Sequence, residues 1–291
     1  MNPIIQQLLS HGPVVTDGAW GTELQARGLG VGEFPDAWNL THPDRVAEVA
    51  RAYVAAGSQV ILTNTFGANR IRLAENAPAD KVVEINKRGV EISRQAAGGK
   101  ASVFASIGPT GKLLLNGDIS PDELRAAFEE QARALAQAGA DALVVETMAD
   151  LEEAKLAVAA AHATGLPVVA CMVFDSGKDK DRTMMGTTPE QAATALMAVG
   201  ADVIGANCGQ GIAGFAVICR RFRAATDRPI WLKPNAGQPK MVEGRAVYAT
   251  SPEEFAGYVP ELVKLGANFV GGCCGSNPDF VAAIARRVRA P

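Results

Sequence analysis

Two adjacent cysteines near the C-terminal end are the residues best suited to chemistry in this chain. They stand in the segment Val270-Gly271-Gly272-Cys273-Cys274-Gly275, where an apolar run opens into a glycine-flanked turn. A disulfide between them would be strained, because consecutive Cα atoms are about 3.8 Å apart and a disulfide prefers roughly 5.5–6 Å. Two thiols held side by side suit a soft metal ion, and a pair of buried core cysteines is the alternative.

A third cysteine, Cys208, also follows an apolar run and precedes a glycine. Three sulfur ligands with an open fourth position are typical of a catalytic zinc site, because a structural site closes with four protein ligands. Thiolates also favour zinc over magnesium or calcium. The three cysteines Cys208, Cys273 and Cys274 are therefore candidate zinc ligands, and a buried structural cysteine at each position is the alternative. The other two cysteines, Cys171 and Cys219, are expected to be buried structural residues.

Eight short apolar runs alternate with helical patterns along the chain. The runs cover residues 14–16, 60–63, 102–107, 142–145, 168–174, 203–206, 230–232 and 269–272. Such runs are typical of parallel strands that are covered on both faces. Eight of them predict an α/β fold, a (β/α)8 TIM barrel that forms a single domain over residues 1–291. The alternative is a doubly wound open sheet, which offers no reason for eight strands and lacks a G-x-G-x-x-G motif after the first.

Several helical patterns start and stop in the same way. Three of them start with a hydroxyl N-cap, a proline and then an acid or amide at the third helical position; the caps are Ser120, Thr188 and Ser251. Four of them stop at a glycine that leads into the next apolar run, as a left-handed C-cap does; the glycines are Gly57, Gly139, Gly200 and Gly266.

These glycines give the strands a common register. The seventh residues after them are Asn64, Glu146, Asn207 and Cys273, and the eighth residues after the last two glycines are Cys208 and Cys274. In a barrel these positions lie at the C-terminal ends of strands, where barrel active sites are built. The register therefore predicts that the three thiols and the Glu146 carboxylate meet at one mouth.

Composition and charge exclude several classes of protein. The chain has 291 residues, 48% of them hydrophobic, and a net charge of −3 with scattered basic residues, so neither nucleic acid nor an anionic membrane is an expected partner. The first ten residues lack the pattern of a signal peptide, and no apolar run is long enough to span a bilayer. The five cysteines are therefore expected to be reduced thiols in a cytoplasmic protein.

Seven short motifs, spread over nearly the whole chain, resemble those of the homocysteine S-methyltransferase family. They are Asp17-Gly18-Ala19-Trp20-Gly21-Thr22, Thr63-Asn64-Thr65-Phe66-Gly67, Ser106-Ile107-Gly108-Pro109, Glu146-Thr147, Gly205-Ala206-Asn207-Cys208, Pro234-Asn235-Ala236-Gly237 and Gly271-Gly272-Cys273-Cys274-Gly275. The family includes betaine–homocysteine methyltransferases. In motif form the chain is most similar to the homocysteine-binding half of cobalamin-dependent methionine synthase.

The resemblance implies a methyl transfer to the thiol of homocysteine, giving methionine. It implies a zinc ion on Cys208, Cys273 and Cys274, and an ammonium site at Asp17 and Glu146. The chemistry is consistent, because zinc deprotonates a bound thiol and the thiolate is the nucleophile. The expected partners are homocysteine and a small methyl donor such as S-methylmethionine, betaine or a thetin, or a methylated corrinoid protein in trans.

The residues alone leave alternatives for these roles. Glu146 could be a charge at the barrel rim that pairs with a basic side chain, and Asp17 could be a turn or N-cap residue. The glycine-rich turns at Gly18 and Gly275 suit a substrate carboxylate, through backbone N–H groups. Asn235 could offer its side-chain oxygen to the metal or the substrate, or could belong to a turn.

Two other functions fit parts of the pattern. One is a metal-free barrel lyase or isomerase that holds a phosphate near Gly271 and Gly272, and the other is a zinc-stabilised, non-catalytic partner of a corrinoid protein. The loops at 175–187 and 237–248 are long, polar and expected on the catalytic side. Each is either a lid or a solvated surface loop.

Overall fold

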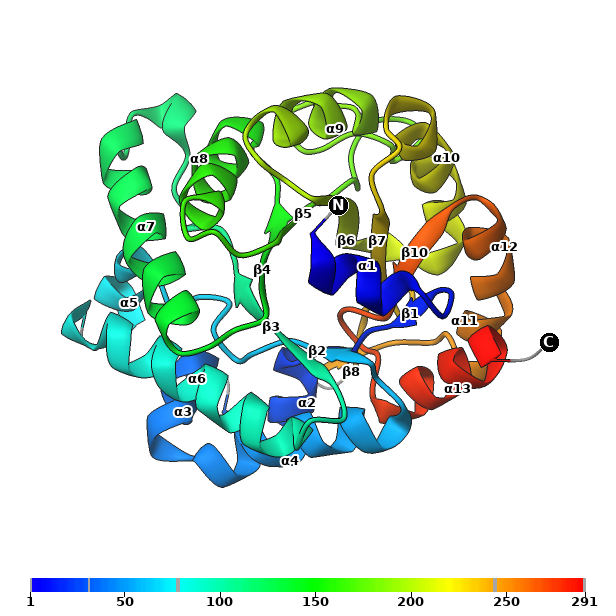
Figure 1. Cartoon of the computed structure of the whole chain (residues 1–291), viewed down its shortest axis with the longest axis horizontal. Coiled ribbons are helices and arrows are strands. Elements are labelled where there is room, and N and C mark those ends of the chain that lie inside the picture. The colour runs from blue at the N-terminus through cyan, green and yellow to red at the C-terminus, as the bar shows by residue number, and fades with distance from the viewer. Residues whose placement is uncertain (1, 31, 77–78, 243–244, 290–291) are drawn as a thin grey trace.

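The computed structural model describes residues 2–30, 32–76, 79–242 and 245–289. Within these ranges eight parallel strands form one sheet in the order β1-β10-β7-β6-β5-β4-β3-β2, and Figure 1 shows it near the centre of the molecule. The strands are β1 (Val14–Val15), β2 (Val60–Ile61), β3 (Ser102–Ile107), β4 (Ala142–Met148), β5 (Val168–Met172), β6 (Val203–Gly211), β7 (Ile230–Asn235) and β10 (Ala267–Val270). Each strand overlaps one of the eight apolar runs, so the predicted strands are confirmed.

Strands β1 and β2, at the two ends of this order, meet and close the ring. The Gln59 N–H donates to the Val15 carbonyl at 2.8 Å, and the Val15 N–H donates to Gln59 Oε1 at 3.0 Å. Nearer the C-terminal ends of the two strands, the Leu62 N–H donates to Asp17 Oδ2 at 2.7 Å. The sheet is therefore a (β/α)8 barrel, as the sequence predicts.

Helices cover the barrel in Figure 1: most form its outer layer, and α1 lies across one end. They are α1 (Pro3–Leu9), α2 (Gly21–Ala26), α3 (Trp38–Thr41), α4 (Pro43–Ala56), α5 (Arg70–Asn76), α6 (Val82–Ala97), α7 (Pro121–Gln137), α8 (Leu151–His162), α9 (Pro189–Ala198), α10 (Phe215–Ala225), α11 (Pro252–Gly257), α12 (Val259–Lys264) and α13 (Pro278–Arg289), with short 3-10 turns η1 (Pro35–Ala37), η2 (Ala79–Lys81), η3 (Leu114–Asn116) and η4 (Ile212–Gly214). Because the helices cover the outer face of the sheet, its strands are apolar on both faces.

The predicted helix ends are also confirmed. Ser120 and Thr188 start α7 and α9 with complete capping boxes, and the Ser251 side chain accepts from the third backbone N–H of α11. At the other ends the four register glycines have φ values of +89° to +107°; they are Gly57, Gly139, Gly200 and Gly266. Since a side chain is strained in this left-handed region, the glycines fix where each helix stops and the next strand starts.

The interior of the barrel is packed with apolar side chains from the strands. Trp231 stacks between Phe104 and Phe269, with ring centroids 6.0 and 5.2 Å away, and all three rings are buried. Ile5 of α1 belongs to the same cluster, and Figure 1 shows α1 lying across this end of the barrel. The N-terminal end is thus closed by α1, and the mouth lies at the other end, where the strands have their C-termini.

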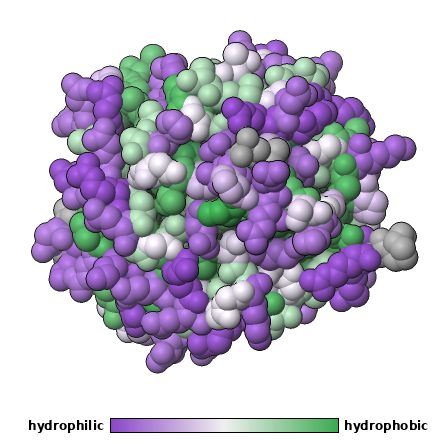
Figure 2. Space-filling model, viewed as in Figure 1, coloured by the Kyte–Doolittle hydropathy of each residue, from purple (hydrophilic) through white to green (hydrophobic). Residues whose placement is uncertain are grey.

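The surface on the α1 side is mostly hydrophilic in Figure 2, with hydrophobic residues lying mainly in the hollows between hydrophilic ones. This distribution agrees with the burial of the apolar side chains inside the barrel and between barrel and helices. In the described part of the chain, no helix combines the length and apolar character that a membrane span requires.

Two loops on the mouth side differ in how they are held. Residues 175–187 are held by contacts with other elements. Asp181 pairs with Arg221 of α10, and Gln210 Nε2 of β6 donates to the Lys180 carbonyl at 2.9 Å. Residues 237–248, predicted as a long polar loop, pair with themselves through the antiparallel strands β8 (Lys240–Val242) and β9 (Arg245–Val247). The difference arises because this loop can satisfy its backbone groups by pairing with itself. Residues 243–244 lie outside the described residues.

We predict that Gly271→Ala destabilises the barrel near its seam. A Cβ at Gly271 would lie 2.0 Å from Thr16 Oγ1 and 2.5 Å from the Asp17 carbonyl oxygen, both on the chain that follows β1. Overpacking of this kind costs about 1–3 kcal/mol of unfolding free energy, which urea denaturation measures.

Gly257→Ala is the matched control, because no atom lies within 4 Å of its added Cβ and the residue ends helix α11. It should be neutral or stabilising by up to about 1 kcal/mol. Equal stability of the two variants would contradict the close approach of the chain after β10 to that after β1.

Candidate metal centre and active site

Three cysteine sulfurs converge at the mouth of the barrel. Cys208 lies on β6, and Cys273 and Cys274 follow β10; their Sγ atoms all lie within 4.8 Å of one another. The Cys208 and Cys274 sulfurs are 3.9 Å apart. Two thiolates bound to one tetrahedral zinc at about 2.3 Å each are about 3.8 Å apart, so this spacing fits a single ion. Among the described residues this is the one cluster of three or more metal-ligating side chains.

The turn that carries Cys273 and Cys274 is held against the end of β7. The Cys273 N–H donates to the Pro234 carbonyl at 2.7 Å, and the Ala236 N–H donates to the Cys274 carbonyl at 2.9 Å. The Ser276 hydroxyl donates to the Cys273 carbonyl at 2.6 Å. The sulfurs therefore rest on a scaffold of strand and turn hydrogen bonds.

Cys208 has a φ of +61°, a backbone conformation that costs free energy for any residue with a side chain. Strain of this kind persists where the surrounding structure imposes it, and it is common at functional sites. Hydrogen bonds from Cys273 and Cys274 lower the pKa of the Cys208 thiol to about 3, whereas the hydrogen bond with Cys208 raises the pKa of Cys273. One thiolate is thus supported by two thiols, and a bound cation would favour ionisation of all three.

Asn235, at the end of β7, adds an unsatisfied acceptor to this cluster. Its side chain is 7% exposed and hydrogen bonds to Cys208, which contributes to lowering the pKa of that thiol. Its Oδ1 atom is buried and has no hydrogen-bond partner. A buried acceptor without a partner is rare, and beside three sulfurs it fits a site built for a cation.

Glu146, on β4, is a carboxylate at the same repeat position as Cys273, the seventh residue after a helix-ending glycine. Its Oε1 accepts from the Ser106 hydroxyl at 2.5 Å, and its Oε2 accepts from Asn207 Nδ2 at 3.3 Å. The side chain is 8% exposed, and burial raises its pKa, which the positive charge of Lys233 opposes. Since an ionised carboxylate has about four acceptor positions, Glu146 keeps capacity for a further donor.

Asn207 links the two halves of the site, a role that the sequence analysis did not assign. It donates to Thr147 Oγ1 at 2.7 Å and accepts from the Thr147 N–H at 2.8 Å, where Thr147 also has a left-handed φ of +62°. Its Nδ2 is 3.9 Å from the Cys273 sulfur. Its place at the mouth could be predicted from the sequence, because Asn207 shares the repeat position of Glu146 and Cys273.

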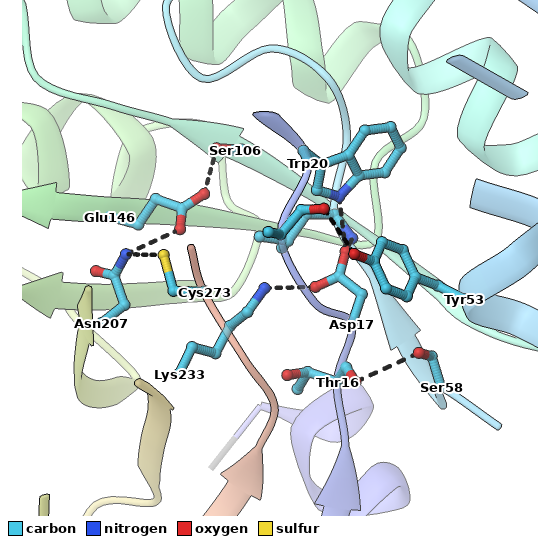
Figure 3. A network of polar contacts seen from close by, with 12 residues as sticks. Thr16, Asp17, Trp20, Tyr53, Ser58, Ser106, Glu146, Asn207, Lys233 and Cys273 are labelled. Atoms are coloured by element: carbon cyan, nitrogen blue, oxygen red, sulfur yellow. Dashed lines mark hydrogen bonds and ion pairs between the residues drawn. The ribbon is translucent and has the colours of Figure 1, made fainter. Parts of the chain in front are cut away.

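A buried ion pair lies beside this network, as Figure 3 shows. Lys233 Nζ is 2.5 Å from Asp17 Oδ1, and the exposed fractions of the two side chains are 3% and 0%. Asp17 Oδ2 accepts from Trp20 Nε1 at 2.8 Å as well as from the Leu62 N–H. Lys233 was not predicted as a site residue, although a lysine within a mostly apolar strand is a signal that the sequence contains.

The remaining predicted site residues lie in the turns after β1 and β10. Gly18 packs against Tyr53, whose hydroxyl would lie 2.7 Å from a Cβ at that position. Gly275 has a φ of +82° and lies under the ring of Tyr248. The two predicted structural cysteines, Cys171 and Cys219, are buried and do not belong to the cluster of three cysteines.

Comparison with known proteins agrees with the geometry. Residues 14–288 match the family model described as homocysteine S-methyltransferase. The chain is 32% identical to the methionine synthase of Mycobacterium tuberculosis over 303 residues, which cover 97% of this chain and 25% of that protein. It is also 32% identical, over 301 residues, to the methionine synthase of Mycobacterium leprae. The chain thus spans about a quarter of the length of these relatives.

The fold is shared with a solved structure of similar size. The homocysteine methyltransferase MmuM from Escherichia coli, in its metallated form, superposes with a TM-score of 0.82 and 24% identity over 98% of this chain and all of the other. The family resemblance inferred from the seven motifs is confirmed by the match over residues 14–288. The chain belongs to the homocysteine S-methyltransferase family.

Proposed function

We propose that this protein transfers a methyl group to the thiol of homocysteine and that it uses a zinc ion to do so. The observation that supports this most is the meeting of three cysteine sulfurs with a buried carboxylate, Glu146, at one barrel mouth. A thiol amino acid needs both: a centre for its sulfur and an anion for its ammonium group.

Cys208, Cys273 and Cys274 would hold the zinc, and Asn235 Oδ1 is a further acceptor for the metal or the substrate. When bound, zinc lowers the pKa of the acceptor thiol and keeps it as a thiolate at neutral pH. The sulfur then donates its electron pair to the methyl carbon. A carbon–sulfur bond forms while the bond from that carbon to the donor breaks, and the donor leaves with the electrons of the broken bond.

The protein's own residues bind and orient the acceptor. Glu146 takes the ammonium group, and its hydrogen bonds with Ser106 and Asn207 hold the carboxylate in place. Backbone N–H groups of the turns at Gly18 and Gly275 are the proposed partners of the acceptor carboxylate. Asp17 contributes through its buried pair with Lys233.

The loops around the mouth bear on the identity of the methyl donor. Six of the nine large hydrophobic side chains that are exposed among the described residues lie in segments that connect a barrel strand to the next outer helix, on the mouth side; they are Phe66, Leu115, Met184, Met185, Met241 and Val247. Exposed apolar side chains grouped around a site are typical of a surface that meets another macromolecule. They favour a donor carried on a protein, such as a methylated corrinoid protein, over a small onium compound.

The surroundings disfavour a phosphate-binding lyase or isomerase. Thiols and the carboxylates of Glu146 and Asp17 lie at this mouth, and Lys233, the one buried lysine among the described residues, is already paired with Asp17. An anionic phosphate would therefore meet mainly negative groups.

A zinc-stabilised partner without catalytic activity is distinguished from a methyltransferase by an activity assay, because such a partner would bind zinc and methylate no thiol.

Cys273→Ala or Cys274→Ala should reduce zinc from about one ion per chain to almost none and abolish methyl transfer, while circular dichroism shows a folded barrel. The reason is that the turn is held by hydrogen bonds independent of the sulfurs. Cys219→Ala is the control, since Cys219 is buried in α10 outside the cysteine cluster and its loss should leave zinc content and methyl transfer unchanged. Global unfolding of the Cys273 or Cys274 variant would show that the zinc is structural.

Glu146→Gln should retain zinc but bind homocysteine roughly tenfold to a hundredfold more weakly. A charge-assisted hydrogen bond to the ammonium contributes about 1.5–3 kcal/mol, and the substitution keeps size and shape. Calorimetric titration of the zinc-loaded protein measures the dissociation constant. A thiol without the amino group, 4-mercaptobutyrate, should bind equally well to both proteins. An equal loss for the two thiols would make Glu146 a support of the metal site.

Met184→Glu combined with Met241→Glu tests the donor. With homocysteine and a methylated corrinoid protein, the variant should show at least about a tenfold rise in the KM for that protein, because a charge is placed on an apolar contact surface. With free methylcobalamin the rate should be unchanged. Val83→Glu, an exposed position on the outer helix α6, is the control. Turnover with S-methylmethionine or betaine, and none with the corrinoid protein, would overturn the protein-borne donor.

A further inference from the structure

Lys233 is an unusual residue in this site. Of the lysines and arginines that the structure describes, it alone is buried, with 2% of its surface exposed. It lies on β7 in an apolar sequence, two residues before Asn235. Burying an ammonium group costs several kcal/mol unless a partner compensates it, so its presence at a barrel mouth calls for a function.

Its partner, Asp17, has both carboxylate oxygens engaged within the protein. Oδ1 receives Lys233 Nζ, and Oδ2 receives the Trp20 indole N–H and the Leu62 backbone N–H. These contacts join the chain after β1 to β2, β7 and the start of α2. Asp17 is 0% exposed and is thus part of the barrel wall.

Glu146 differs from Asp17 in each of these respects. It has one short hydrogen bond, from Ser106, and one long one, from Asn207, and 8% of its surface is exposed. In Figure 3 the Lys233 amine points to Asp17, with Glu146 on the opposite side. The charges of Asp17, Lys233 and Glu146 therefore alternate, and together they leave a single net negative charge.

We propose that Lys233 is a positioning residue for acceptor recognition: it holds Asp17 in the barrel wall, so that Glu146 alone receives the ammonium group of the acceptor. This inference rests on the proposed function. An acceptor with one ammonium group neutralises the remaining charge, and the order of charges becomes Asp17, Lys233, Glu146, ammonium. Asp17 then acts through Lys233 and does not contact the substrate.

The proposal predicts an unusual result when Asp17 is changed. In Asp17→Asn the Lys233 charge loses its partner, and Glu146 is the other carboxylate that acts on it. Lys233 should turn to Glu146 and compete with the ammonium of the acceptor. We expect homocysteine to bind at least about tenfold more weakly, because the charge-assisted contact is blocked.

Removing the lysine as well should restore binding. In Asp17→Asn combined with Lys233→Met, Glu146 is again free, methionine fills the volume of the lysine stem, and the asparagine oxygen can still accept from Trp20 and Leu62. We expect homocysteine to bind within about threefold of wild type, and the double variant to melt at a higher temperature than Asp17→Asn, which holds an unpaired buried charge. If Asp17 contacted the ammonium directly, the double variant would bind no better than Asp17→Asn.

The experiment measures the dissociation constants of homocysteine and of 4-mercaptobutyrate for four zinc-loaded proteins: wild type, Asp17→Asn, Asp17→Asn with Lys233→Met, and Glu146→Gln. The thiol without an amino group should bind all four within about threefold, which a merely structural effect on the metal site would not allow. Should Asp17→Asn fail to fold, the double variant still decides, because only the proposal expects it to match wild type. Weak homocysteine binding by a folded, zinc-loaded double variant would overturn the role of Lys233. Absence of homocysteine binding by the wild type itself would overturn the proposed function and this inference together.

Discussion

Closure of the barrel between β1 and β2 is the constraint on which the site depends. Two hydrogen bonds of Gln59, one from its backbone N–H and one to its side-chain oxygen, and one hydrogen bond from Leu62 to Asp17 turn a row of eight strands into a ring. The strands β6 and β10 flank β7 in this sheet, and the curvature of the ring turns their ends inward, where the Cys208 and Cys274 sulfurs are 3.9 Å apart. Asp17 belongs both to the closure and to the charge network, so the integrity of the barrel and the electrostatics of its mouth are coupled.

The site stores strain and resolves it with side-chain hydrogen bonds. Cys208 and Thr147 both have a left-handed backbone conformation without being glycine. Asn207 directly precedes Cys208 and hydrogen bonds to the backbone and the hydroxyl of Thr147. A conformation that costs free energy persists when such contacts over-determine it. The result is that a carboxylate from β4 and a thiol from β6 face the same mouth.

Buried charge is the other organising principle of this mouth. Lys233 and Asp17 compensate each other in the wall, whereas Glu146 and the sulfurs keep acceptor capacity towards the opening. A cation bound to the sulfurs would balance their charge, and an ammonium group bound to Glu146 would balance the charge of that carboxylate. This division between paired charges in the wall and available ones at the opening is what suits the site to a zwitterionic thiol.

Sequence alone determined the strands, the capped helix ends and the convergence of Cys208, Cys273 and Cys274, because these follow from apolar runs and from glycines that repeat at a constant distance from each strand end. It placed Glu146 at the mouth for the same reason. It did not reveal that Lys233 pairs with Asp17, 216 residues away, or that Asn207 joins Thr147 to the cysteines. Pairings between side chains from distant strands depend on the tilt and the stagger of the strands in the closed barrel, which only the tertiary structure decides. The hairpin of β8 and β9 belongs to the same class, since a polar loop carries no apolar periodicity by which pairing could be predicted.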